Sequence, residues 1–67
     1  MMLIKKLNNY KYYCQSLGRY TSLYEIGKWI YESEEVYVEH SGKDITKKIT
    51  LRALLTFREK YENSKDA

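Results

Sequence analysis

Cys14 is the only cysteine in this chain of 67 residues, so the fold cannot contain an internal disulfide. One cysteine and one histidine, His40, also cannot fill a tetrahedral zinc site by themselves. A domain of this size without such crosslinks depends on one thin apolar core, and self-association often adds to its stability. The residues that can form this core are Leu3, Ile4, Leu7, Leu17, Leu23, Ile26, Trp29, Ile30, Val36, Val38, Ile45, Ile49, Leu51, Leu54, Leu55 and Phe57. The sequence therefore predicts a monomer of modest stability or a homodimer, and we favour the homodimer.

The first third of the chain has the pattern of short strands joined by a turn. Residues 3–7 predict a short strand of mixed polarity, and residues 10–14 are rich in tyrosine, which favours strands. Residues 15–18 predict a turn, because Gly18 can adopt positive φ. Residues 19–21 then return antiparallel to the preceding strand, which predicts a β-hairpin.

Helix signals follow directly. Ser22 and Glu25 form a capping box, in which Ser22 accepts a hydrogen bond from the Glu25 N–H and the Glu25 carboxylate accepts one from the Ser22 N–H. Apolar residues then recur at helical spacing, and they are Leu23, Ile26 and Ile30. This spacing predicts a helix over residues 22–32. Gly27 lies inside it at a cost of about 1 kcal/mol relative to alanine, and a closely packed neighbour would explain its presence.

The second half of the chain has a similar order. Residues 36–40 alternate with period two, which predicts a half-buried strand, and Ser41-Gly42 predicts a hairpin turn into a return strand over residues 44–47. A last helix is expected to open at Ile49 or Thr50. One stripe of this helix carries Leu51, Leu54, Leu55 and Arg58, and Phe57 and Tyr61 lie beside it. Residues 63–67 are polar and are expected to fray. The predicted order β-β-α-β-β-α gives one small α+β domain over residues 1–62.

Charge is distributed in three blocks. Residues 1–24 contain four basic and no acidic side chains, residues 25–39 contain five glutamates against one lysine, and residues 40–60 contain six basic against two acidic side chains. If the fold brings the two basic blocks together, one face is positive and the opposite face is negative. A mixed, solvated surface is the alternative interpretation, because many domains with other functions carry a net charge as modest as +3.

The sequence does not indicate catalytic chemistry. His40 stands alone on a predicted strand, and Cys14 has no activating partner except nearby Lys11. The three glycines form no phosphate-binding loop. We therefore expect that this chain is not an enzyme and that it has no cofactor or metal site. No signal peptide and no membrane-spanning run are visible, which together with the lone thiol predicts a cytoplasmic protein that does not enter a membrane.

The stretch from residue 4 to residue 26 interleaves basic residues with tyrosines and asparagines. Basic side chains can meet phosphate, and tyrosine and asparagine can reach sugars or base edges. A two-stranded ribbon also fits the major groove of duplex DNA. The predicted DNA contacts are Lys5, Lys6, Asn8, Asn9, Lys11, Tyr12 and Arg19, with Lys48 and Arg52 as secondary phosphate contacts. The alternative is that the tyrosines fill a sheet face while the lysines solvate its edges.

The chain also carries motifs in a definite order. Residues 4–13 read IKKLNNYKYY, and Arg19-Tyr20, Ser22-Leu23 and Glu25-Ile26 follow, with Gly42-Lys43-Asp44-Ile45-Thr46 later in the chain. In this order and spacing they resemble the N-terminal DNA-binding domain of polyhydroxyalkanoate synthesis regulators, whose patterns are I-K-[KR]-Y-x-N-R-[KR]-L-Y-D, R-Y-V-T-L-E-D-L and G-x-D-I-T. The resemblance covers residues 4–55. It implies a small bacterial transcriptional regulator that binds duplex DNA.

Three positions depart from the family pattern. Tyr10 stands where the family has arginine, Cys14 where it has aspartate, and Leu7 where tyrosine is common. If that arginine contacts DNA, binding by this chain is weaker or altered. If it pairs with the aspartate, the two changes together remove one ion pair. The polymer-sensing region of longer family members has no counterpart here, so we do not extend the polymer role to this chain.

A second function class stays open. The exposed tyrosines and the acidic middle of the chain could instead form a surface for a protein partner, since tyrosine is enriched at protein interfaces. Such a protein-interaction module would keep the family fold without binding DNA.

Overall fold

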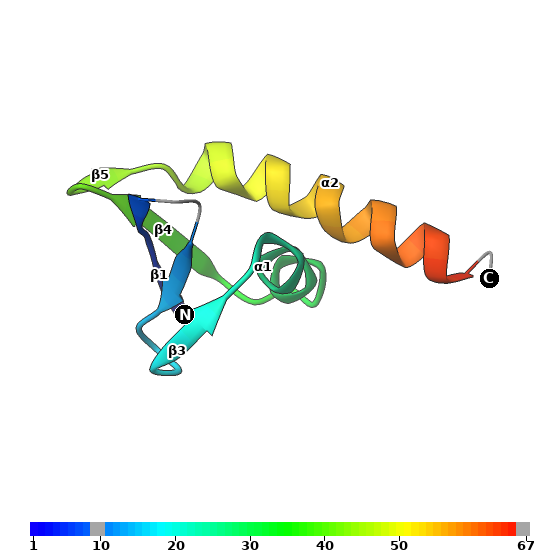
Figure 1. Cartoon of the computed structure of the whole chain (residues 1–67), viewed down its shortest axis with the longest axis horizontal. Helices are drawn as coiled ribbons and strands as arrows, with labels where there is room; N and C mark the ends of the chain where they lie inside the picture. The colour runs from blue at the N-terminus through cyan, green and yellow to red at the C-terminus, as the bar shows by residue number, and fades with distance from the viewer. Residues whose placement is uncertain (9–10, 66–67) are drawn as a thin grey trace.

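The computed structural model describes residues 1–8 and 11–65, with residues 62–65 as backbone only. Its elements are β1 (Met2–Lys6), β2 (Tyr12–Cys14), β3 (Arg19–Thr21), α1 (Leu23–Tyr31), β4 (Val36–His40), β5 (Lys43–Asp44) and α2 (Thr46–Lys65) (Figure 1). The predicted α+β class is confirmed. Three strands precede the first helix, where the predicted order has two.

The five strands form one mixed sheet in the order β3-β2-β1-β4-β5. Both predicted hairpins are present, because β2 pairs antiparallel with β3 and β4 pairs antiparallel with β5. The central strand β1 joins them, running antiparallel to β2 and parallel to β4. The strand pattern of residues 3–7 does not indicate that β1 is the central strand, because both of its partners, β2 and β4, come later in the chain.

The core lies between one face of the sheet and the two helices. Register sets Ile4 beside Cys14 and Val38, and all three side chains are buried. The helices contribute Ile26, Ile49 and Ala53 to the same core, and Figure 1 shows both helices on one side of the sheet. Since side chains alternate between the two faces of a strand, the neighbouring row points away from the helices.

Helix α1 begins as the capping signal predicts. The side chain of Ser22, the N-cap, accepts a hydrogen bond from the Glu25 N–H at 3.2 Å. The reciprocal half of the predicted capping box is wrong. The Glu25 carboxylate instead accepts hydrogen bonds from the side chains of Arg19 and Thr21, because strand β3 delivers both donors directly to the first turn of the helix.

Gly27 lies at the closest approach of α1 and α2. A Cβ atom at this position would lie 2.2 Å from the carbonyl oxygen of Ala53 and 2.8 Å from the Cβ of Phe57. The closely packed neighbour expected from the sequence is therefore present. Both Gly27 and Ala53 are buried. Because these are the two smallest residue types, they allow the backbones of α1 and α2 to approach closely.

Helix α2 begins earlier than its apolar pattern predicts. The predicted return strand over residues 44–47 ends at Asp44, and the helix starts at Thr46 rather than at Ile49 or Thr50. The Asp44 side chain accepts a hydrogen bond from the Thr46 N–H at 2.9 Å. Hydrogen bonding to the Thr46 side chain, and then to its N–H, lowers the pKa of Asp44. The Thr46 hydroxyl in turn accepts a hydrogen bond from the Val38 N–H at 2.9 Å. These bonds stop the strand and start the helix, which continues to Lys65 and so into the tail expected to fray.

The predicted core face of α2 is wrong in part, since the core candidates Ile49 and Phe57 are buried but the stripe residues Leu51 and Leu55 are not. Leu51 and Leu55 are 68% and 60% exposed, whereas Ile49, Ala53 and Phe57 form the buried face. Spacing of four and eight residues keeps these three side chains on one side of the helix. Close packing against Gly27 selects this side, because it accepts alanine at the contact and excludes leucine. Leu3 and Leu17, two further core candidates, are exposed as well.

Candidate nucleic-acid interface

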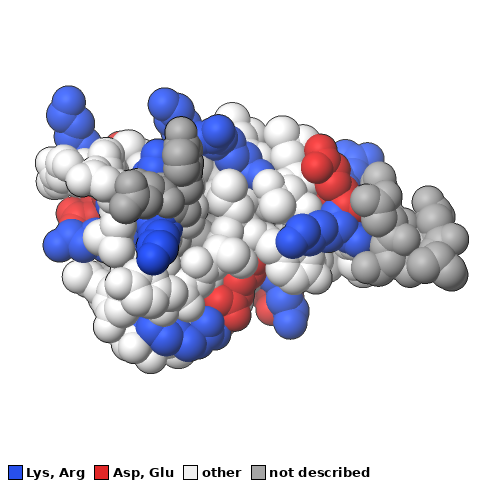
Figure 2. All heavy atoms as spheres, viewed as in Figure 1, with Lys and Arg blue, Asp and Glu red and all other residues white. Residues whose placement is uncertain are grey.

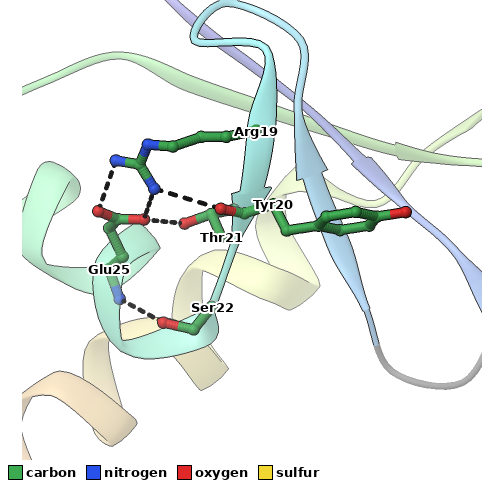
Figure 3. Close-up of polar contacts among 5 residues, drawn as sticks. All are labelled: Arg19, Tyr20, Thr21, Ser22 and Glu25. Carbon is green, nitrogen blue, oxygen red and sulfur yellow. Dashed lines mark hydrogen bonds and ion pairs between the residues drawn. The ribbon is translucent and has the colours of Figure 1, made fainter.

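Arg19 is a structural residue rather than an open cation. Its guanidinium donates two hydrogen bonds of 2.8 Å to the two carboxylate oxygens of Glu25, and it also donates to the Tyr20 carbonyl oxygen (Figure 3). This bidentate pair joins β3 to the first turn of α1. An internal carboxylate thus already neutralises the charge of Arg19, and its contact with DNA stays a prediction.

The ion pair predicts a definite dependence of stability on pH. Hydrogen bonds from Arg19 lower the pKa of Glu25 from 4.5 to about 2. A lowered folded-state pKa stabilises the protein above the unfolded-state value, and this stabilisation is lost as the pH falls from 4.5 towards 2. Because the Glu25 side chain is 29% exposed, solvent screens the pair, and we expect a contribution of about 1 kcal/mol at pH 7.

Urea unfolding of the wild type and of Glu25→Gln between pH 2 and pH 7 measures this contribution. The variant should be less stable at pH 7, and the difference should vanish near pH 2. Glu32→Gln, at the C-cap of the same helix, is the matched control and should lack this pH-dependent difference. An equal difference between wild type and Glu25→Gln at both ends of the pH range would show that the ion pair does not contribute.

Two more of the predicted DNA contacts have other roles. Tyr12 is 4% exposed and belongs to the core, so its ring cannot enter a groove of DNA, and that prediction is corrected. Strand alternation buries it, because its register partners Lys6 and Thr21 share the face that turns towards the helices. Lys5 lies on the opposite face, 3.9 Å from the Glu39 carboxylate. Asn9 lies outside the described residues.

Lys11 and Arg52, which are far apart in the sequence, line one pocket of about 270 Å³. Its other lining residues are Tyr12, Thr21, Ser22 and Leu23. The pocket therefore forms where the start of β2, the end of β3, the amino terminus of α1 and the side of α2 meet. Two cations, the hydroxyl groups of Tyr12 and Ser22 and the positive end of a helix dipole make this environment suitable for an anion.

The Tyr12 hydroxyl adds a donor to the wall of this pocket. Burial raises the pKa of Tyr12, while the positive charge of Arg52 acts in the opposite direction. Among the described residues, no hydrogen bond engages this hydroxyl. A phenol with a raised pKa stays protonated at neutral pH and can donate to a phosphate oxygen. Only the hydroxyl, and not the ring, is thus available to a ligand.

A second pocket, of about 210 Å³, lies between the end of β1 and the turn that follows β4. It is lined by Lys5, Lys6, Leu7, Asn8, His40 and Ser41. The His40 ring nitrogen Nδ1 is 2.9 Å from the Lys6 carbonyl oxygen, which fixes the β4–β5 hairpin beside the end of β1. Lys6 pairs with Tyr12 across the sheet, so both pockets lie at the same end of the sheet.

The structure thus brings together Lys6, Asn8, Lys11 and Arg52, with Lys48 one helical turn before Arg52. Among the described residues, no carboxylate forms an ion pair with any of these four cations. Figure 2 shows Lys and Arg side chains gathered at this end of the sheet and along the first half of α2. We call Lys6, Lys11, Lys48 and Arg52 the basic end.

Sequence reasoning missed Thr21 and Ser22 as pocket residues and missed the position of the Tyr12 hydroxyl. Ser22 is recognisable from the sequence only as a helix cap. No sequence signal shows that the capped end of α1 faces Lys11 and Arg52, because that depends on how α2 crosses α1.

Comparison with protein-family models, curated proteins and solved structures finds no match to this chain. The resemblance to polyhydroxyalkanoate synthesis regulators therefore stays a prediction from its motifs. In the described part of the chain, no helix combines the length and the apolar character needed to cross a membrane. The same residues contain no group of three or more potential metal-binding side chains.

Proposed function

We propose that this chain binds duplex DNA through the basic end and acts as a small transcriptional regulator. The observation that carries the proposal is the convergence of Lys11 and Arg52 on one pocket at the amino terminus of α1. Neither cation is neutralised by a carboxylate of the described residues, unlike Arg19. The motif resemblance supports the same function from the sequence.

In this proposal the pocket holds one backbone phosphate, and the remaining cations follow the strand. Arg52 and Lys11 supply charge, while the Tyr12 hydroxyl and the amino terminus of α1 supply directed donors. Lys48 and Lys6 contact neighbouring phosphates on either side. Asn8, which is exposed beside the second pocket, is the described candidate for a base-edge contact.

The test is retention of sheared bacterial genomic duplex DNA over a salt series. If the four cations of the basic end neutralise four phosphates, the logarithm of the binding constant should fall against the logarithm of salt concentration with a slope of about −3.6 per protomer. Sequencing of the retained fragments then identifies the operator. Retention that salt does not change, or no retention at low salt, would contradict the proposal.

The protein-interaction module stays a second candidate because of α2. Leu51 and Leu55 are exposed one helical turn apart, so they place two apolar side chains together on the outer side of α2. A partner bound there would be held by apolar contact, which salt does not weaken. The same salt series therefore separates the two candidates.

A further inference from the structure

The face of the sheet that points away from the helices is apolar and aromatic. Register and strand alternation place on it Leu3, Lys5, Tyr13, Tyr20, Tyr37 and Glu39. Tyr20 is 59% exposed, Leu3 41% and Tyr37 36%. A sheet face in contact with water usually carries polar side chains. We call these six residues the open face, since no described element lies over it (Figure 1).

The charges of the open face do not favour a polyanion. Lys5 is balanced by Glu39, and Asp44 lies beside Glu39 in the next strand, on the same face. This face therefore lacks the excess of positive charge that defines the basic end. The open face instead carries the cation Lys5 on β1 and the anion Glu39 on the adjacent strand β4. This arrangement is self-complementary, because a second copy can place its own anion opposite the cation.

We propose that the open face binds a second copy of this chain, with a two-fold axis along the seam between β1 and β4. Strands β1 and β4 are parallel, with Leu3 beside Tyr37 and Lys5 beside Glu39. Rotation by 180° about an axis along their seam exchanges the two strands. Lys5 then faces the partner's Glu39, and Leu3 faces the partner's Tyr37. Such an isologous contact joins each charge to its opposite across the interface.

This symmetry has a consequence for the basic end. An axis parallel to the strands preserves their direction, so the connections between β1 and β2 of both copies lie at the same end of the dimer. Both basic ends can then contact one DNA duplex, as half-sites of a palindromic operator require. This consequence rests on the proposed function, whereas the dimer itself does not.

The interface is expected to be weak. Strands of two to five residues give a small sheet, so we expect its face to bury less than the area of about 800 Å² per partner that is typical of stable complexes. We therefore expect a dissociation constant in the micromolar range, which equilibrium sedimentation can measure.

Charge reversal tests the proposed contact directly. Lys5→Glu alone and Glu39→Lys alone should each prevent self-association, because like charges would meet across the two-fold axis. An equimolar mixture of the two variants should form a heterodimer at least ten times tighter than the wild-type dimer. In the wild type, Lys5 and Glu39 already neutralise each other within one chain, whereas the two like charges of each variant are neutralised only across the interface. An intramolecular role for the pair cannot produce this result, because neither chain in the mixture contains both opposite charges.

Two controls complete the experiment, and circular dichroism verifies that every variant is folded. Lys28→Glu, on the exposed side of α1, makes the same charge change away from the open face and should leave the dimer intact. The double variant Leu51→Ser, Leu55→Ser should also leave it intact. A wild-type monomer at millimolar concentration, a mixture that does not associate, or loss of the dimer in the leucine variant would overturn the proposal. DNA binding by a monomeric variant would leave the proposed function standing.

Discussion

Replacing Gly27 with alanine should destabilise the domain by about 2–3 kcal/mol, the effect of overpacking a tightly filled core. The new Cβ would lie 2.2 Å from the Ala53 carbonyl oxygen, and this atom cannot move without shifting the backbone of α2. Helix propensity alone predicts the opposite sign, since alanine is favoured over glycine by about 1 kcal/mol. Thermal unfolding followed by circular dichroism should show a fall in Tm of roughly 8–24 °C, at about 4–8 °C per kcal/mol for a domain of this size.

The double variant Gly27→Ala, Ala53→Gly tests the geometry of this contact. The atoms closest to the added Cβ belong to the Ala53 backbone and to Phe57, so removing the Ala53 side chain should not restore stability. Gly27→Val should leave no folded protein, because a domain this small has only about 3–5 kcal/mol of stability to lose. An unchanged or higher Tm in Gly27→Ala would contradict the close approach of the two helices.

Reversing both charges in the pocket, with Lys11→Glu and Arg52→Glu, should abolish DNA binding. We expect the affinity for duplex DNA at low salt to fall at least about 100-fold, because two phosphate contacts become repulsive. The salt dependence should also become shallower, by about 1.8 in the log–log slope for the two lost contacts. Electrophoretic mobility shift with a fragment that the wild type retains gives both quantities.

Net charge alone would also weaken binding, so a matched control is needed. Each reversal changes the charge by two, which takes the formal net charge from +3 to −1. Lys28→Glu with Lys43→Glu makes the same change at two exposed lysines outside the pocket. This control should lose less than about tenfold in affinity, since it keeps every contact of the basic end. Equal losses in the two double variants would show that the pocket is not the binding site.

The clearest difference between sequence and structure concerns Arg19. Its place in a basic, tyrosine-rich stretch predicts a DNA contact, and nothing local shows that it is neutralised. The sequence identifies Glu25 as part of a helix cap, but its carboxylate can accept hydrogen bonds from the Ser22 N–H or from side chains of β3. Strand β3 ends directly before α1, so the guanidinium of Arg19 reaches the carboxylate and makes two hydrogen bonds to it. A bidentate ion pair is stronger than one bond to a backbone N–H.

Local patterns were enough to predict the α+β class, both hairpins and the Ser22 cap of α1, because these features depend on turn residues, capping groups and periodicity within a few residues. The buried face of α2, the pairing of Arg19 with Glu25 and the meeting of Lys11 and Arg52 appear only in the folded chain. These depend on how close two helices approach at Gly27 and on a central strand paired with segments distant in the chain. Local patterns contain no information about such contacts, since the energy that selects them comes from packing between elements.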